Sequence, residues 1–514
     1  MATLALPAPR PRPRTAPAPL VLAGITLMAV AFALRAAQFG NPINGLDEQY
    51  YLLVGDRMWQ GLLPYVDLWD RKPFGLFLLF AGIRLLPGDG VIAAQAVATM
   101  FAAATALVAT LIARRRTGWA PATMAGILYL GAINELWGET SQTPVFYNLF
   151  VALAALLVLR ATDAPLSPRG RRLGIAAMLL AGLAVQVKTI ALFEGAFLGC
   201  WLLAAAWRTG ARPPALLGLT LRLALAGAAP TLAVMMLYLA LGQFDAWWQA
   251  NVLSVIAKGA PVDPDAQQRL IGSVILATPM LALALLGIWA ATRRFTRCSG
   301  DTPFLIGWAA AGVAQFFAIG GFWPHYALPL ALACTPLAAS AFALPRVGTM
   351  LFIGAIAWPT WHAVMINPAI ARSDRAAAAR VVAAIPPQVR DQCMFVYEGP
   401  VAYYLLAGGC TVTPWSFSAH LRSAVEAPTL GVDPVGALRA ALDRRPAAIL
   451  TIANSQWNDR FAATDRLIAQ VLARDYVRAA ALPNRDYGPA ETILVWRRRD
   501  LPATPVEPGP APRG

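Results

Sequence analysis

Carboxylate and basic side chains are concentrated in residues 38–72, directly after the first long apolar run. A carboxylate can accept a proton from a reacting hydroxyl, and a lysine or arginine can bind a phosphate. The alternative is solvated charge beside an aromatic belt at a membrane surface, because tryptophans and tyrosines are interleaved with the charges. The residues concerned are Asp47, Glu48, Asp56, Asp67, Asp70, Arg57, Arg71 and Lys72, with Tyr50, Tyr51, Trp59, Tyr65 and Trp69.

The composition of the whole chain indicates an integral membrane protein. Of its 514 residues, 58% are hydrophobic and 13% are charged, whereas a soluble domain carries about 25% charged residues. Such an apolar excess excludes a mainly disordered chain. The formal net charge is +15, which could suggest nucleic-acid binding. The arginines, however, lie in short clusters between apolar runs, so we interpret them as orientation signals and expect no nucleic-acid partner.

Eleven apolar runs are long enough to approach the span of a hydrocarbon core, which takes about 20 residues of helix. They lie near residues 18–37, 91–113, 118–134, 145–159, 173–190, 191–207, 223–241, 270–292, 303–321, 324–343 and 347–366. The predicted fold class is therefore an α-helical polytopic membrane protein. The first run is longer than the apolar part of a signal peptide and is predicted to be an uncleaved anchor. Residues 1–17, rich in Pro, Ala and Arg, are predicted to be a disordered cytoplasmic arm.

Basic residues predict the orientation of these spans. Arginines are clustered in every second connection, at residues 10–14, 114–116, 160–172, 208–222 and 293–297, with Arg346 after the tenth span. Placing these connections in the cytoplasm puts the N-terminus inside and, with an odd number of spans, the residues after 366 outside. The predicted location is the inner, cytoplasmic membrane. Residues 73–87 would invert all later loops if they crossed, so we predict a re-entrant or interfacial helix on the outer face.

Several short motifs in the first outer loop, residues 38–90, are specific enough to suggest a family. They are Asp47-Glu48-Gln49-Tyr50-Tyr51, Gly61 to Pro64-Tyr65, and Asp67-Leu68-Trp69-Asp70-Arg71-Lys72-Pro73. This arrangement resembles the GT-C glycosyltransferases, and among them the protein O-mannosyltransferase and aminoarabinose-transferase group. That group has an Asp-Glu pair after the first span and a Lys-Pro start to a juxtamembrane helix. Later similar motifs are Gln186-Val187-Lys188 and His325-Tyr326-Ala327-Leu328-Pro329.

The resemblance implies a reaction and roles for two residues. A hexosyl or pentosyl group would move from a polyprenyl phosphate to a lipid, glycan or protein acceptor outside the membrane, with inversion at the anomeric carbon. Asp47 would take the acceptor proton, while Glu48 would orient the acceptor, pair with a cation or hold a metal. Without the resemblance, the sequence favours Asp47 as the N-cap of a helix over residues 49–59.

A leaving group that is a lipid phosphate needs nearby cations. Lys188 lies near the outer end of the fifth run, where a charge is costly and usually functional, although a lysine there can also snorkel to the interface. Glu194 is a candidate partner of Lys188 within the next run. His325 can donate to the phosphate or ligate a metal. The predicted substrate-binding set is Lys188, His325, Tyr326, Arg71, Lys72, Asp67, Asp70, Glu194 and Glu139.

One place departs from the family pattern. Many similar proteins carry an acidic residue in the second outer loop, where this chain has Gly138-Glu139-Thr140-Ser141-Gln142-Thr143-Pro144. The carboxylate is therefore either displaced to Glu139 or absent. The departure leaves open whether a divalent metal ion is a cofactor, and no metal ligands are assigned.

Two other kinds of function stay open. A flippase or transporter of lipid-linked sugars would need polar residues through several spans, whereas the intramembrane charges here are few and lie near the outer side. No Walker-type phosphate loop is present to power a pump. A non-catalytic subunit with the same fold is disfavoured by the intact Asp47-Glu48 pair and favoured by the missing second acidic residue.

Beyond residue 366, long apolar runs stop and strands alternate with helices, which predicts a small extracytoplasmic α/β domain over residues 367–500. Cys393 and Cys410 both lie in this domain and are predicted to form a disulfide. Trp415 and His420 could contact a glycan or simply pack. Residues 501–514 are predicted to be a disordered tail. The predicted strands are 392–397, 447–452 and 491–496, and the predicted helices are 400–407, 435–443 and 459–474.

Overall fold

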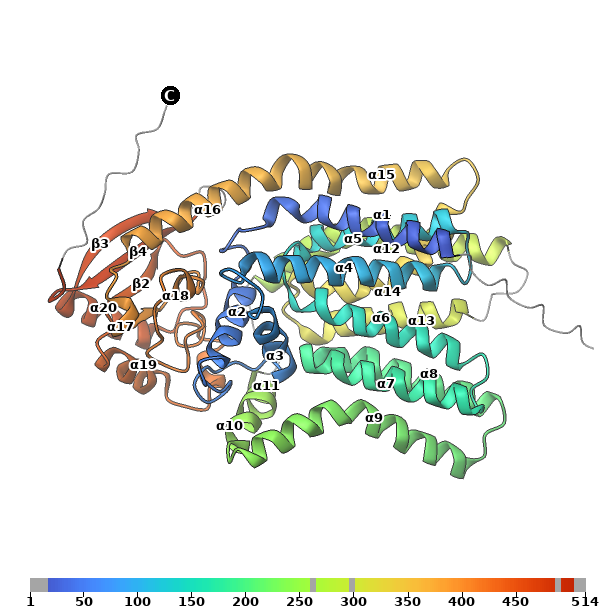
Figure 1. Cartoon of the computed structure of the whole chain (residues 1–514), viewed down its shortest axis with the longest axis horizontal. Coiled ribbons are helices and arrows are strands. Elements are labelled where there is room, and N and C mark those ends of the chain that lie inside the picture. The colour runs from blue at the N-terminus through green and yellow to red at the C-terminus, as the bar shows by residue number, and fades with distance from the viewer. Residues whose placement is uncertain (1–16, 259–264, 295–300, 486–490, 503–514) are drawn as a thin grey trace, which may run out of the picture.

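The computed structural model describes residues 17–258, 265–294, 301–485 and 491–502. Long helices form a bundle, a small domain with a β-sheet lies at one end, and two short helices lie between them (Figure 1). The predicted disordered arm, residues 1–17, lies outside the described residues except for Pro17. Of the predicted disordered tail, only Leu501 and Pro502 lie within them.

Ten helices in the described residues are long and apolar enough to cross a membrane. They are α1 (Pro17–Arg35), α4 (Val91–Ala113), α6 (Thr143–Ala161), α7 (Pro168–Val187), α8 (Leu192–Arg208), α9 (Pro213–Ala240), α12 (Ala266–Arg294), α13 (Asp301–Ile319), α14 (Leu328–Phe342) and α15 (Gly348–Trp361). Of these, α8, α14 and α15 reach this length together with adjoining helical turns, as Thr189–Arg208, Pro324–Phe342 and Gly348–Ala384. The remaining predicted span forms α5 (Trp119–Ile133), which has 15 residues and continues in a π-helical turn, η2 (Asn134–Gly138). Because α5 packs against α1, α4 and α14, it belongs to the same bundle.

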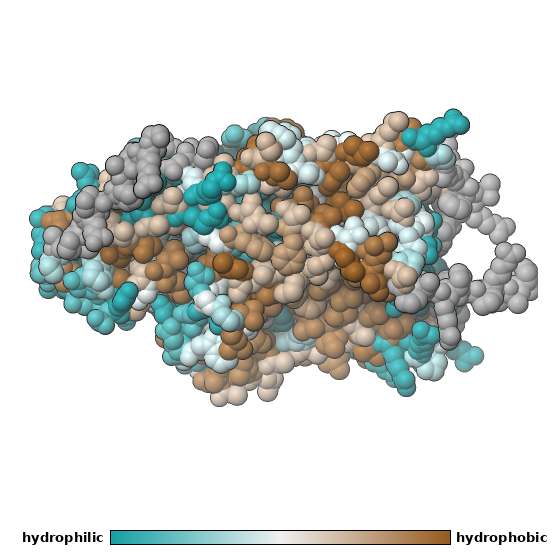
Figure 2. All heavy atoms as spheres, turned by 45° about the horizontal axis from the view of Figure 1, so that its top comes forward, coloured by the Kyte–Doolittle hydropathy of each residue, from teal (hydrophilic) through white to brown (hydrophobic). Residues whose placement is uncertain are grey.

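The surface of the bundle is apolar over a broad band. Figure 2 shows hydrophobic residues gathered over the bundle, with hydrophilic residues on the C-terminal domain and at the opposite end. Leu22, Leu217, Ile275, Leu285 and Met350 are each more than half exposed on this band. Isolated exposed apolar residues are ordinary, but a continuous band of this size is a surface that lipid covers. The chain is therefore a multi-pass membrane protein.

The two ends of the bundle differ in charge. The connections α4–α5, α6–α7, α8–α9 and α14–α15 lie at the end far from the sheet domain (Figure 1). The first three of these connections contain clustered arginines, and the fourth contains Arg346. Their common position agrees with the prediction that every second connection is basic and lies on the same side of the membrane. The assignment of this end to the cytoplasm remains a proposal.

The first outer loop forms two short helices, α2 (Leu46–Met58) and α3 (Phe74–Ile83), between the bundle and the C-terminal domain (Figure 1). With ten residues, α3 is too short to span a hydrocarbon core, so the prediction of a helix that does not cross is confirmed. Gly55 allows α2 to touch α3, because a Cβ there would lie 2.6 Å from the backbone of Phe80. This contact fixes the helix that carries the Asp-Glu pair.

A continuous helical segment joins the bundle to the C-terminal domain. From α15, the chain passes through a π-helical turn, η6 (His362–Ile366), into α16 (Asn367–Ala384) without leaving helical structure. The predicted domain boundary near residue 367 therefore falls inside one long helix rather than in a linker. Two short helices after α9 also reach toward this end, α10 (Phe244–Trp248) and α11 (Ser254–Lys258).

The C-terminal domain contains a four-stranded sheet in the order β1-β2-β4-β3, with β1 and β2 parallel and the other pairs antiparallel. Three strands match the prediction, whereas β3 was missed because its alanine-rich, largely exposed residues give little strand signal. The predicted disulfide between Cys393 and Cys410 is confirmed. The elements are β1 (Met394–Val396), β2 (Ala448–Ala453), β3 (Tyr476–Pro483), β4 (Thr492–Arg498), α17 (Val389–Gln392), α18 (Tyr403–Leu406), α19 (Pro434–Asp443) and α20 (Ala462–Asp475).

Candidate active site

The N-cap position of helix α2 is one that only glycine can occupy. Gly45 is its N-cap residue, with φ +80°, a backbone conformation that side chains with a Cβ disfavour. A Cβ at this position would lie 1.9 Å from Oε2 of Glu48. Asp47 therefore stands in the first helical turn, where its side chain caps no backbone N–H. The alternative interpretation of Asp47 as an N-cap is wrong.

The Asp47 carboxylate is held by two side chains. The hydroxyl of Tyr51 donates to Oδ2 at 3.0 Å, and the Lys72 ammonium lies 3.5 Å from the same oxygen. Burial alone raises the pKa of Asp47, but the charge of Lys72, other nearby cations and the Tyr51 hydrogen bond outweigh it and lower the pKa. Its side chain is still 31% exposed. Asp47 is thus an ionised carboxylate that a substrate can reach.

Three more residues of the predicted set lie on the bundle side of Asp47. Lys188 ends α7, and its ammonium is 4.5 Å from the ring centroid of Tyr326. The ring of His325 lies 4.5 Å from the same tyrosine ring. The charges of Lys72 and Lys188 both act on the pKa of Asp47. The structure therefore brings together residues from α2, the loop before α3, the end of α7 and the 3-10 turn before α14, namely Asp47, Lys72, Lys188, His325 and Tyr326.

Two members of this group have polar atoms to offer a ligand. His325 is 8% exposed, and its Nδ1 atom has no hydrogen-bond partner among the described residues. No carboxylate in the described part of the chain forms an ion pair with Lys188. Glu194, the expected partner, instead accepts a hydrogen bond from Trp308 Nε1 at 3.0 Å and is fully buried in α8. The predicted pairing is wrong because the rotation of α8 turns Glu194 toward α13.

Glu48 points away from Asp47 and into the protein. It is 5% exposed, and it accepts hydrogen bonds from Thr140 Oγ1 at 2.5 Å and Gln142 Nε2 at 3.2 Å. Burial is the main cause that raises the pKa of Glu48 to about 8. Within the described residues, it forms no ion pair with a cation. Its contacts join the first outer loop to the second, which suits a residue that positions α2.

A buried arginine that the sequence analysis missed holds the second outer loop. Arg35, at the end of α1, is 1% exposed and donates to Thr99 Oγ1 at 3.0 Å. It also donates to the backbone carbonyls of Gly138 and Thr140. Thr140 in turn holds Glu48. The available signal was a charge at the outer end of an apolar run, because such charges rarely lack a role.

The remaining predicted residues shape the loops instead of joining the group around Asp47. Asp67 accepts from the backbone N–H of Leu63 at 2.7 Å. Asp70 accepts from the backbone N–H groups of Arg71 and Lys72 at 2.6 and 3.3 Å, and burial raises its pKa. The Arg71 side chain turns away from Lys72 and pairs with Glu426 of the C-terminal domain.

Glu139 stands apart from Asp47 as well. Its Oε1 atom accepts from Asn44 Nδ2 at 3.3 Å, while its Oε2 atom has no partner in the described residues. Burial raises the pKa of Glu139. Among the described residues, no three His, Cys, Asp or Glu side chains are grouped closely enough to hold a metal ion. We therefore assign no metal ligands, and no step below depends on a metal.

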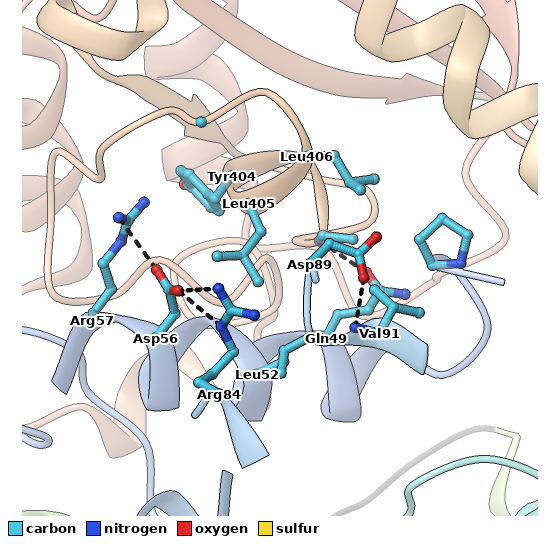
Figure 3. Close-up of a pocket in the computed structure, with 13 residues that line it drawn as sticks. Gln49, Leu52, Asp56, Arg57, Arg84, Asp89, Val91, Tyr404, Leu405 and Leu406 are labelled. Atoms are coloured by element: carbon cyan, nitrogen blue, oxygen red, sulfur yellow. Dashed lines mark hydrogen bonds and ion pairs between the residues drawn. The ribbon is translucent and has the colours of Figure 1, made fainter. Parts of the chain in front are cut away.

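A cavity of about 160 Å³ lies on the opposite face of α2, between this helix and α18 (Figure 3). At 100° per residue, Gln49, Leu52 and Asp56 point away from Asp47. Asp56 pairs with Arg57 at 3.6 Å and Arg84 at 2.9 Å, as the dashed lines in Figure 3 mark. Because these charges already satisfy one another, the cavity is a packing feature of the interface rather than a second reactive site.

Comparison with known proteins places the fold. No protein-family model and no curated protein sequence matches the chain. Among solved structures, it resembles the aminoarabinose transferase ArnT from Cupriavidus metallidurans bound to undecaprenyl phosphate. The TM-score is 0.59 at 15% identity, covering 94% of this chain and 98% of that one. For ArnT in the apo state, these values are 0.60, 14%, 94% and 98%. The expectation drawn from the first-loop motifs is confirmed at the level of the fold, and the chain has the membrane fold of the GT-C glycosyltransferases.

Proposed function

We propose that this protein is an inverting glycosyltransferase of the outer face of the cytoplasmic membrane. It moves a hexosyl or pentosyl group from a polyprenyl phosphate to a hydroxyl of a lipid, glycan or protein acceptor. The observation that carries the proposal is the reachable, ionised Asp47, 3.5 Å from Lys72 and grouped with Lys188 and His325 at the end of an apolar bundle. This group combines a base with cations at the end of the bundle nearest the C-terminal domain.

Asp47 acts as the general base in this reaction. It takes the proton from the acceptor hydroxyl as the acceptor oxygen bonds to the anomeric carbon of the sugar. The bond between that carbon and the phosphate oxygen breaks, and its electron pair leaves on polyprenyl phosphate. Attack from the side opposite the phosphate inverts the anomeric configuration. The lowered pKa of Asp47 keeps it in the form that can accept this proton at neutral pH.

Lys72 and Lys188 stabilise the charge that develops on the leaving phosphate. Lys72 now faces Asp47, while Lys188 faces the ring of Tyr326 and has no carboxylate partner in the described residues. A bound phosphate draws both ammonium groups toward itself, and His325 donates from the buried side. Moving Lys72 from Asp47 to the phosphate raises the basicity of Asp47 as the reaction needs it.

The fold supports this division of roles. The polyprenyl tail extends along the apolar surface of the bundle, while the acceptor comes from the C-terminal domain side. The likeness to ArnT, one structure of which contains undecaprenyl phosphate, supports a lipid-phosphate carrier. Glu48, Arg35 and Thr140 hold α2 and the second outer loop in register, so that Asp47 keeps its place.

The direct test is turnover of a panel of radiolabelled polyprenyl-phosphate sugars by the purified full chain in nanodiscs. We expect one sugar to be released or transferred, and we expect the anomeric configuration of a transferred sugar to be opposite to that of the donor. Binding of these donors without any turnover, together with their movement across a liposome membrane, would show a transporter instead. Retention of the anomeric configuration would contradict Asp47 as a base in a single displacement.

A further inference from the structure

The first outer loop also contacts the C-terminal domain through a cluster that the proposed mechanism does not use. Arg71 pairs with Glu426 and donates to Thr429 Oγ1 at 2.5 Å. The Lys258 ammonium, at the end of α11, lies 2.6 Å from the other oxygen of Glu426. One carboxylate thus holds two cations that come from different outer segments.

Several buried polar nitrogens beside this cluster have no hydrogen-bond partner in the described part of the structure. They are Trp69 Nε1, Arg71 Nε, Trp415 Nε1 and His420 Nδ1. Trp69 is 4% exposed and His420 is 3% exposed. An unsatisfied buried donor costs about 1–3 kcal/mol, so several in one place indicate that acceptor atoms are missing.

Three of these side chains lie in one neighbourhood, and Trp415 follows a residue that contacts it. The rings of Trp69 and His420 lie 4.9 Å apart, and the Arg71 guanidinium is 5.6 Å from the Trp69 ring. The backbone N–H of Trp69 donates at 2.9 Å to the carbonyl of Pro414, the residue before Trp415. The side chains of Arg71 and Lys258 are 16% and 32% exposed. Both cations are therefore partly open to solvent at the edge of the cluster.

The chemistry of the cluster selects among ligands. Two indole N–H groups and one guanidinium N–H can donate but not accept. A sugar hydroxyl would bring a further donor, whereas a phosphate or carboxylate brings acceptors alone. Lys258 and Arg71 lower the pKa of Glu426 to about 2 against the effect of burial, so Glu426 cancels one of the two cations. Among Arg71, Lys258 and Glu426, one positive charge remains, which matches an oxyanion.

We propose that Arg71, Trp69, Trp415 and Lys258 form a subsite for an oxyanion group, phosphate or carboxylate, carried by the acceptor. This assignment rests on the proposed function, because the subsite binds the acceptor of that transfer. Arg71 is the chain neighbour of Lys72, whose ammonium is 3.5 Å from Asp47. Because the Arg71 side chain turns toward Glu426, an acceptor anchored there by its oxyanion extends along the first outer loop to bring its hydroxyl to Asp47. The substrate is therefore an acidic lipid or glycan.

The test is equilibrium binding of radiolabelled inorganic phosphate to the full chain in nanodiscs, at constant ionic strength. Trp69→Phe and Trp415→Phe keep an aromatic ring and remove one N–H donor. Each is expected to weaken phosphate binding by about tenfold, the effect of one hydrogen bond to a charged group. Trp207→Phe, at a site on α8 that is 70% exposed, is the matched control and is expected to bind as the wild type does. Melting temperatures confirm that each variant is folded.

Lys188→Gln separates this subsite from the donor phosphate position. We expect Lys188→Gln to retain the phosphate binding that depends on Trp415, even if the proposed transferase activity itself proves wrong. Competition by acetate or by phenyl phosphate then identifies which oxyanion the subsite prefers, and methyl glucoside is expected not to compete. Wild-type phosphate affinity in both Trp→Phe variants would overturn the proposal. It would show that water satisfies the two indole N–H donors. Loss of all phosphate binding in Lys188→Gln, or equal competition by methyl glucoside, would overturn it as well.

Discussion

The carboxylate of Asp47 and the ammonium of Lys72 lie 3.5 Å apart. They belong to α2 and to the loop before α3, two helices that lie between the bundle and the C-terminal domain (Figure 1). Tyr51, one helical turn after Asp47, donates to the same carboxylate oxygen. These two contacts keep the Asp47 carboxylate ionised.

Removing the charge of Lys72 is expected to change the pH dependence of turnover as well as its rate. Because Lys72 lowers the pKa of Asp47, Lys72→Met raises that pKa, and the acid limb of the kcat/KM profile moves to higher pH. Lys258→Met removes a lysine that contacts Glu426 instead of Asp47, so its acid limb stays in place. An unshifted acid limb in Lys72→Met would show that Asp47 does not control it.

Gly45→Ala is expected to destabilise the protein, because the new Cβ would lie 1.9 Å from Glu48 Oε2. Either Glu48 leaves Thr140 or α2 shifts, at a cost of about 1–3 kcal/mol beyond the strain of the positive φ. Gly61→Ala is the matched control, because Gly61 also has a positive φ, +85°, but open space around its Cβ position. Thermal unfolding of both variants decides the matter. Equal losses of stability would mean that the contact with Glu48 is unimportant.

Arg35→Met is expected to cost roughly 2–5 kcal/mol of unfolding free energy, because it leaves the buried carbonyls of Gly138 and Thr140 without a donor. Turnover is expected to fall as well, since Thr140 holds Glu48. Arg212→Met, at an exposed N-cap of α9, serves as the control for loss of an arginine. A stable, fully active Arg35→Met protein would refute the role of Arg35 as a positioning residue.

The ion cluster of Glu426 is expected to make stability depend on pH. The pKa of Glu426 is lowered to about 2 in the folded protein, whereas an unfolded glutamate titrates near 4.3. Its contribution is therefore complete above the unfolded pKa and is lost as pH falls toward 2. The unfolding free energies of wild type and Glu426→Gln should differ most near pH 6 and converge below pH 4. A difference that is constant over this range would contradict the assignment.

The sequence was most informative about elements that hydropathy defines. The ten long helices and the short α3 were predicted because lipid permits few alternatives to apolar helices. The strand β3 was missed because Tyr476–Pro483 forms an edge strand with mostly exposed residues. The contact of α2 with α3 at Gly55 was not predicted, because hydropathy does not specify it.

The candidate site was harder to predict than the fold, because it depends on side-chain direction. Arg71 and Lys72 are neighbours in sequence, yet one meets Glu426 and the other Asp47. Glu194 was expected beside Lys188, but the rotation of α8, which hydropathy does not specify, turns it toward Trp308. Arg35 acts through the backbone of a loop that lies far away in the chain. Contacts of this kind follow from tertiary packing, which local sequence does not encode.

The most direct test of the central claim is single-turnover release of polyprenyl phosphate by wild type, Asp47→Asn and Asp89→Asn in matched nanodiscs. Asp89 is the control because its carboxylate caps the backbone N–H of Val91 outside the group around Asp47. We predict that Asp47→Asn lowers the rate by about 10²–10⁴-fold, the usual effect of losing a general base, while Asp89→Asn keeps the wild-type rate. A wild-type rate in Asp47→Asn, with the protein folded and donor bound, would contradict Asp47 as the base.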